Sequence, residues 1–116
     1  MKKIAFIFSI SFLLCLGNIS AQNVVLDDKK VAAIESLVEN KLLKFDYELE
    51  KAWVSPTVWT QYNLDGKQSF TILCAMYIKH RKRDRSDKHP VLDLYDYNNG
   101  KRIASFGPLA GFRTFN

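Results

Sequence analysis

Two stretches of the chain carry apolar residues at helical spacing. Over residues 28–44 the apolar side chains fall on one side of a helical wheel, and Asp27 and Asp28 are placed to cap the start. Over residues 66–81 most of the helical circumference is apolar, as in a helix that is buried on more than one side. Asp65, with Gln68 three residues later, forms a capping-box pattern before this second stretch. The pattern therefore predicts an amphipathic first helix and a central helix.

Three shorter stretches have the pattern of strands. Apolar and polar residues alternate over 45–50 and the run continues to Val54, so a strand is expected over 47–54. Two further runs, 91–96 and 101–106, are joined by a turn that contains Asn99-Gly100, the strongest short-range signal for a hairpin. The pattern predicts an antiparallel sheet that contains a C-terminal β-hairpin.

Two segments join these elements or follow them. Ser55 followed by Pro56 is a helix-start signal, so a short helix is expected over 56–62. The tail over 112–115 is expected either to add an edge strand or to lie across the core. The predicted fold class is α+β: a small antiparallel sheet with a C-terminal β-hairpin, packed against two main helices.

The first 21 residues have the order of a secretory signal peptide. Lys2 and Lys3 precede an apolar run over 4–16, and the small residue Ala21 supplies a cleavage position. The apolar run is shorter than the roughly 20 residues of a spanning helix, so we expect no stable membrane span after cleavage. A lipoprotein would carry a small residue directly before Cys15, where this chain has leucine. We therefore predict an exported protein, periplasmic or secreted, with one globular domain over 22–116.

Charge and cysteine content narrow the functional classes. The chain has 17 basic and 12 acidic residues, and loss of Lys2 and Lys3 with the signal leaves a domain that is only mildly basic.

Cys74 is the one thiol after cleavage, so no internal disulfide forms. Its apolar neighbours favour a core cysteine over a nucleophile. His80 and His89 fit no metal-ligand spacing, and we expect neither a metal nor a cofactor.

A basic stretch over 79–88 is the most distinctive polar feature. It could bind an anionic surface. Alternatively, its first residues could complement the negative C-terminal end of the central helix, and the rest could be a solvated loop. Nucleic acid is not expected as a partner, because export separates the chain from it and no aromatic residue is interleaved. Trp53 and Trp59 are expected to fill core volume, whereas Tyr97 in the hairpin turn is expected to be exposed. The candidate partner-contact residues are Lys79, Arg81, Lys82, Arg83, Arg85, Lys88 and Tyr97.

These observations favour a non-enzymatic protein-binding module of the inhibitor, immunity or accessory-subunit type. No residue is predicted to be catalytic, because no nucleophile with a base, no ligand cluster and no phosphate loop is visible in the sequence. The main alternative is a binder of anionic envelope or glycan ligands that uses the basic loop 79–88. A small enzyme without a recognisable motif is the third interpretation.

Overall fold

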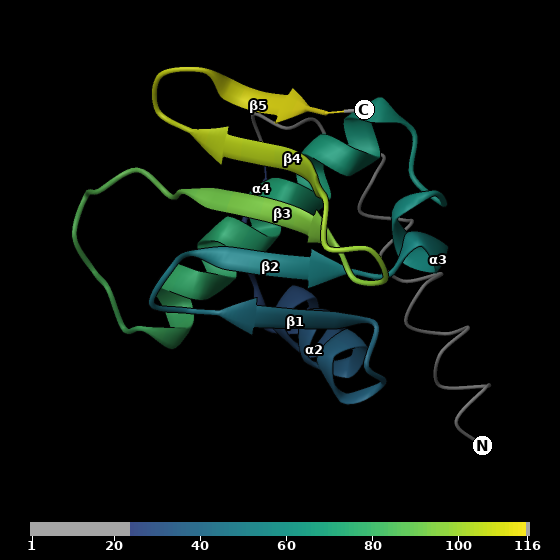
Figure 1. The fold of residues 1–116 in the computed structure, drawn as a ribbon. Coiled ribbons are helices and arrows are strands. Elements are labelled where there is room, and N and C mark those ends of the chain that lie inside the picture. The colour runs from purple at the N-terminus through teal and green to yellow at the C-terminus, as the bar shows by residue number, and fades with distance from the viewer. Residues whose placement is uncertain (1–23, 116) are drawn as a thin grey trace.

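The computed structural model describes residues 24–115, which form a five-stranded sheet and three helices (Figure 1). The α+β class predicted from the sequence is confirmed. The predicted signal peptide, 1–21, lies outside the described residues. No helix in the described range is both long enough and apolar enough to span a membrane. In chain order the elements are α2 (Asp28–Glu39), β1 (Leu43–Asp46), β2 (Lys51–Val54), α3 (Pro56–Trp59), α4 (Leu64–Arg81), β3 (Leu92–Asp96), β4 (Arg102–Gly107) and β5 (Gly111–Thr114).

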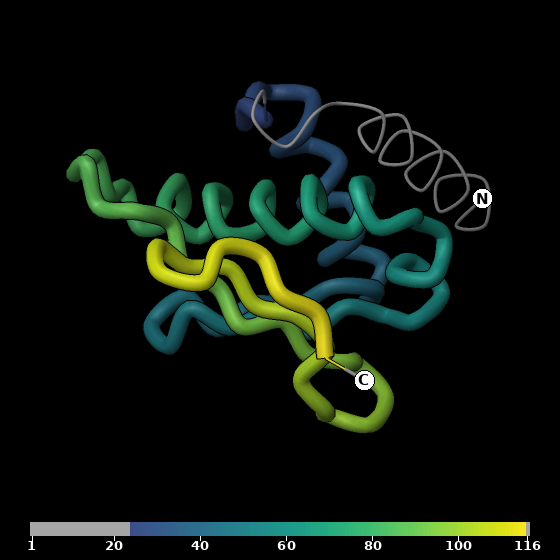
Figure 2. Tube along the Cα trace, turned by 90° about the horizontal axis from the view of Figure 1, so that it is seen from above, coloured from purple at the N-terminus to yellow at the C-terminus, as the bar shows by residue number. Residues whose placement is uncertain are grey.

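The strands lie in the order β1-β2-β3-β4-β5. All neighbours are antiparallel except β2 and β3, which are parallel because the chain crosses through α3 and α4 between them. The sheet is therefore mixed, although it is mostly antiparallel as predicted. Figures 1 and 2 show α2 and α4 on the same side of the sheet, and α4 runs across the strands.

The core lies between that side of the sheet and the two main helices. Alternate strand residues such as Val54 and Leu94 are fully buried, and they face α4. Tyr77 on α4 also donates a hydrogen bond from its hydroxyl to Glu35 on α2, at 3.1 Å, which ties the two helices together. The largest fully buried side chains are Ile34, Leu37, Leu43, Leu73, Ile78, Leu92, Leu94, Val54, Val58, Thr71 and Cys74.

The boundary between the first helix and the first strand differs from the prediction. The helix begins as predicted, with Asp27 as N-cap, but it ends at Glu39 because Lys41 adopts a left-handed backbone (φ 61°) that reverses the chain. Residues 43 and 44, at the end of the predicted helix, belong to β1 instead. Residues 47–50 are a turn, closed by a hydrogen bond from the Leu49 amide to Asp46 (3.1 Å), so the predicted strand 47–54 retains only β2.

The remaining boundaries are closer to the prediction. Ser55 caps α3, which ends three residues earlier than expected. The side chain of Asn63, and not that of Asp65, accepts from the Gly66 amide (2.8 Å), so α4 begins two residues earlier than predicted. The predicted hairpin is confirmed as β3–β4, and its turn has a left-handed Gly100 (φ 73°). The C-terminal tail forms the edge strand β5, which is the first of the two placements considered.

Candidate functional site

One face of the sheet carries no helix in the described part of the chain. Figure 2 shows α2 and α4 on the other side, while the β3–β4 turn bends toward this uncovered side. Because side chains alternate along a strand, the residues opposite the buried set all point here. We call this surface the open face. It is made of one row with Lys44, Trp53, Tyr95, Arg102 and Phe115 and a second row with Asp46, Lys51, Asp93, Ser105 and Arg113.

A β-bulge in β4 decides which side chains complete the first row. Leu94 pairs with Ala104, but the next residue, Tyr95, pairs with Arg102, so Ile103 is the extra residue. Ile103 packs against the core, and Arg102 takes the position across from Tyr95. A regular ladder would have placed isoleucine on the open face. The bulge therefore exchanges an apolar side chain for a cationic one at this position.

An aromatic pair lies in the middle of the open face. The rings of Trp53 and Tyr95 stack with centroids 5.5 Å apart and planes at 25°. The Lys44 ammonium lies 4.9 Å from the Trp53 ring and 5.4 Å from the Tyr97 ring, and that of Lys51 lies 5.5 Å from the Tyr95 ring. Since β1 and β3 flank β2 on opposite sides, both faces of the Trp53 indole are covered.

The β4–β5 side of the open face is cationic as well. The Arg102 guanidinium lies 4.2 Å from the Phe115 ring, and that of Arg113 lies 5.6 Å from the same ring. Arg102 also forms an ion pair with Asp93 at 3.6 Å, between side chains that are 48% and 37% exposed. At such exposure the pair contributes little stability, about 1 kcal/mol or less. Arg102 therefore remains able to contact a partner.

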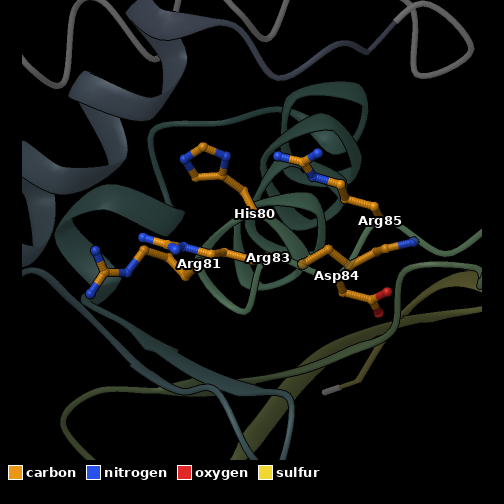
Figure 3. Close-up of a pocket in the computed structure, with 6 residues that line it drawn as sticks. His80, Arg81, Arg83, Asp84 and Arg85 are labelled. Carbon is orange, nitrogen blue, oxygen red and sulfur yellow. The ribbon is translucent and has the colours of Figure 1, made fainter.

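The basic residues singled out from the sequence do not converge on one point. Lys79 folds back to donate hydrogen bonds to the backbone carbonyls of Ser86 (2.9 Å) and Lys88. The Arg81 guanidinium lies 5.6 Å from the Tyr47 ring, so it packs on the β1–β2 turn. In Figure 3, which draws residues that line the hollow at the end of α4, Arg81 and Arg83 extend to the left, whereas His80 and Arg85 lie above them. The structure thus gives Lys79 and Arg81 internal contacts.

The rest of the basic loop is open to solvent. Lys82, Arg83, Arg85 and Lys88 are exposed. Within residues 24–115 the side chains of the three residues Lys82, Arg83 and Arg85 make no hydrogen bond, ion pair or ring contact. Asp84 accepts from the Ser86 amide at 3.0 Å, and hydrogen bonds from Ser86 lower the pKa of its carboxyl group.

Cys74 and His80, two residues with possible catalytic chemistry, lie in different surroundings. Cys74 is fully buried, and burial raises the pKa of its thiol, as expected for a core cysteine. His80 is exposed on α4, where its ring lies 6.1 Å from that of Tyr77. Among residues 24–115 no three His, Cys, Asp or Glu side chains group in a way that could hold a metal ion.

Two aromatic residues, Trp53 and Tyr97, differ in burial from what the sequence predicts. Trp53 was expected to fill the core, but it is half-buried on the open face and takes no part in the core cluster. The signal that could have placed it is its neighbours: Ala52 and Val54 are buried, so Trp53 must point the other way. Trp59 does pack against the core, as expected. Tyr97, expected to be exposed, is half-buried beside Lys44.

Comparisons of this chain with protein-family models, with curated proteins and with solved structures found no match.

Proposed function

We propose that the chain is an exported, non-enzymatic protein-binding module whose open face docks against an acidic surface of a partner protein. The observation that carries the proposal is the Trp53–Tyr95 stack, which lies uncovered in the middle of the sheet and is flanked by cationic side chains. The export part of the proposal rests on the signal-peptide pattern at the start of the sequence.

The composition of the open face supports a protein as the partner. Tryptophan, tyrosine and arginine are the residues most enriched among those that dominate binding energy at protein interfaces. Here they lie on paired strands and hold one another in place, so little side-chain freedom remains to be lost on binding. This pre-organisation favours a shape-matched macromolecular partner.

Ring-stacking ligands fit the same surface less well. A sugar or a nucleobase that stacks on an aromatic side chain needs a free ring face. The Trp53 indole has Tyr95 against one face and the Lys44 ammonium over the other. A stacking ligand would first have to displace one of them. A protein surface can contact the rings and ammonium groups where they already lie.

The charges of the open face support an acidic partner. Its cations are Lys44, Lys51, Arg102 and Arg113, whereas its acids are only Asp46 and Asp93. Both acids already have contacts within the chain, to the Leu49 amide and to Arg102. The open face therefore presents net positive charge to an approaching partner protein. An acidic surface on that partner would raise both the association rate and the specificity of binding.

The test is capture of a partner by two surface variants of the full chain, tagged at the C-terminus and expressed in the producing cells. The open-face variant combines Trp53→Ala and Arg102→Glu. The control variant combines Lys82→Ala, Arg83→Ala and Arg85→Ala, which changes charge on the basic loop only. We expect a partner protein that wild type and control capture and that the open-face variant loses.

A charge exchange then tests the contact itself. Once the partner is identified by mass spectrometry, an acidic residue on it is changed to lysine, and binding is measured by calorimetry against both wild type and Arg102→Glu. Restored affinity in the reversed pair supports direct docking on the open face. Capture that is unchanged by the open-face variant would overturn the proposal.

A further inference from the structure

The turn between β4 and β5 carries no polar side chain. With the two glycines that end β4 and begin β5, it reads Gly-Pro-Leu-Ala-Gly over 107–111, and Leu109 at its tip is completely exposed (101% of the reference area). Gly, Pro, Asn, Asp and Ser dominate turns because they adopt or fix the turn's backbone angles or hydrogen-bond to its backbone, and Leu109 at the tip is not one of these types. We call residues 107–111 the apolar finger. A leucine in this position gains nothing from the fold, since it touches no core residue.

The apolar finger follows Phe106, which contacts His89, the residue directly after the basic loop 79–88. Leu92 pairs with Phe106 at the ends of β3 and β4, so the residues before β3 run next to the start of the finger. The rings of His89 and Phe106 lie 5.0 Å apart and connect the two segments. Figures 1 and 2 show both segments projecting from the same end of the sheet. The loop thus runs from the end of α4, beside the β1–β2 turn, to the strand next to the finger, and its exposed cations lie at the same end of the sheet as Leu109.

We propose that the apolar finger and the basic loop together bind the surface of an anionic lipid bilayer. Leu109 inserts between the lipid chains, while Lys82, Arg83, Arg85 and Lys88 contact the phosphates of the headgroups. Insertion removes from water the apolar area that the fold leaves exposed. Basic side chains near a membrane surface are attracted by its negative potential. The proposal does not depend on the open face, which uses different residues.

The arrangement of the cations fits a bilayer better than a single anion. Of the four cations, Figure 3 labels Arg83 and Arg85, and their guanidinium groups lie apart from each other. A bilayer presents many anionic headgroups spread over a plane, and cations that lie apart can each meet one. An acidic glycan would also attract these cations, but it would offer no apolar environment to Leu109. The lipid surface uses both features of this end of the molecule.

The test is co-sedimentation of the chain with two kinds of vesicle, phosphatidylcholine alone and phosphatidylcholine mixed with phosphatidylglycerol. Wild type is expected to bind only the mixed vesicles. Leu109→Ser should weaken that binding about tenfold, which corresponds to the lost burial of one leucine side chain. The variant with Lys82→Gln, Arg83→Gln and Arg85→Gln should lose about a hundredfold, at about fivefold per cation.

The matched control is Leu64→Ser. Leu64 is also exposed (64%), but it lies at the first residue of α4, at the other end of an 18-residue helix from the basic loop. Its substitution should leave vesicle binding unchanged, and circular dichroism should show the wild-type fold for all variants. The same variants are also tested on immobilised heparin as an acidic glycan.

Three outcomes would overturn the proposal: equal binding to both kinds of vesicle, wild-type affinity of Leu109→Ser for the mixed vesicles, or tighter binding to heparin that does not change with Leu109→Ser. The last outcome would assign the basic loop to acidic glycans. None of these results would affect capture of a protein by the open face, so the two proposals fail separately.

Discussion

The placement of Trp53 on the open face makes a quantitative prediction about stability. Replacing a tryptophan in a packed core by alanine costs about 3–5 kcal/mol, because a cavity is left behind. On the open face the substitution Trp53→Ala leaves no cavity. The side chain then contributes only its contacts with Tyr95 and Lys44.

Those contacts set the expected loss. The aromatic pair contributes about 0.5–1.5 kcal/mol beyond its buried area. The cation–π contact with Lys44 contributes about 0.5–1 kcal/mol at an exposed site. Trp53→Ala should therefore lower the free energy of unfolding by about 2 kcal/mol. Trp53→Phe keeps an aromatic ring next to Tyr95 and should cost about 0.5 kcal/mol or less.

Urea unfolding of the purified chain, followed by circular dichroism, measures these differences. With an m-value of about 1–2 kcal/mol/M for a domain of this size, Trp53→Ala should lower the midpoint by about 1–2 M without a change in slope. Leu94→Ala is the matched comparison on the buried face of the neighbouring strand, where the leucine is fully buried. It should cost about 2–5 kcal/mol. A double-mutant cycle of Trp53→Ala with Tyr95→Ala should return a coupling of about 1 kcal/mol.

Two results would refute the placement of Trp53. The first is a loss of 3 kcal/mol or more in Trp53→Ala, together with a loss above 1 kcal/mol in Trp53→Phe, since only a filled core position responds in that way. The second is a coupling with Tyr95 close to zero, because stacked neighbours cannot be energetically independent.

Three further predictions concern other parts of the chain. Stability should fall as the pH rises above about 9. Burial raises the pKa of the Cys74 thiol and of the Tyr62 phenol above their ordinary values of 9.0 and 10.0, so only the unfolded chain loses these protons. Urea titrations that give the same free energy of unfolding from pH 8 to 11 would contradict this. Gly66→Ala should destabilise the chain by about 1 kcal/mol in the same assay, although alanine favours helices. The new Cβ would lie 2.9 Å from Cδ1 and 3.1 Å from Cβ of the buried Tyr62, and a gain in stability would show that the ring gives way. The protein recovered from the cell envelope or medium should have the intact mass of a chain that begins at Gln22, whereas full-length chain confined to the cytoplasm would rule out the predicted export.

Features that depend only on a few adjacent residues could be predicted from the sequence. The Ser55-Pro56 start of α3 and the hairpin around Gly100 each depend on a few adjacent residues, and both are confirmed. The start of β1 could not be predicted in the same way. It depends on a left-handed backbone at Lys41, a residue type that gives no sign of this conformation.

The candidate site depends on contacts between distant residues, and these were not visible in the sequence. The parallel pairing of β2 with β3 brings Trp53 next to Tyr95, across 42 positions of the chain. The bulge at Ile103 then brings Arg102 across from Tyr95. Local alternation could have placed each side chain on the correct face of its own strand. It could not show that the three side chains form one surface.

The positions of the two proposed surfaces determine how the open face would be oriented in a chain that is bound to a bilayer. The apolar finger and the basic loop lie at one end of the strands, and the β3–β4 turn with Tyr97 lies at the other end (Figure 1). A chain bound to a bilayer through the finger would therefore hold its strands steeply to the membrane plane, with the open face directed sideways. A partner protein could then dock on the open face without displacing the chain from the lipid. Anionic vesicles should consequently leave the affinity for the captured partner unchanged, and strong competition between vesicle and partner would mean that the two surfaces overlap.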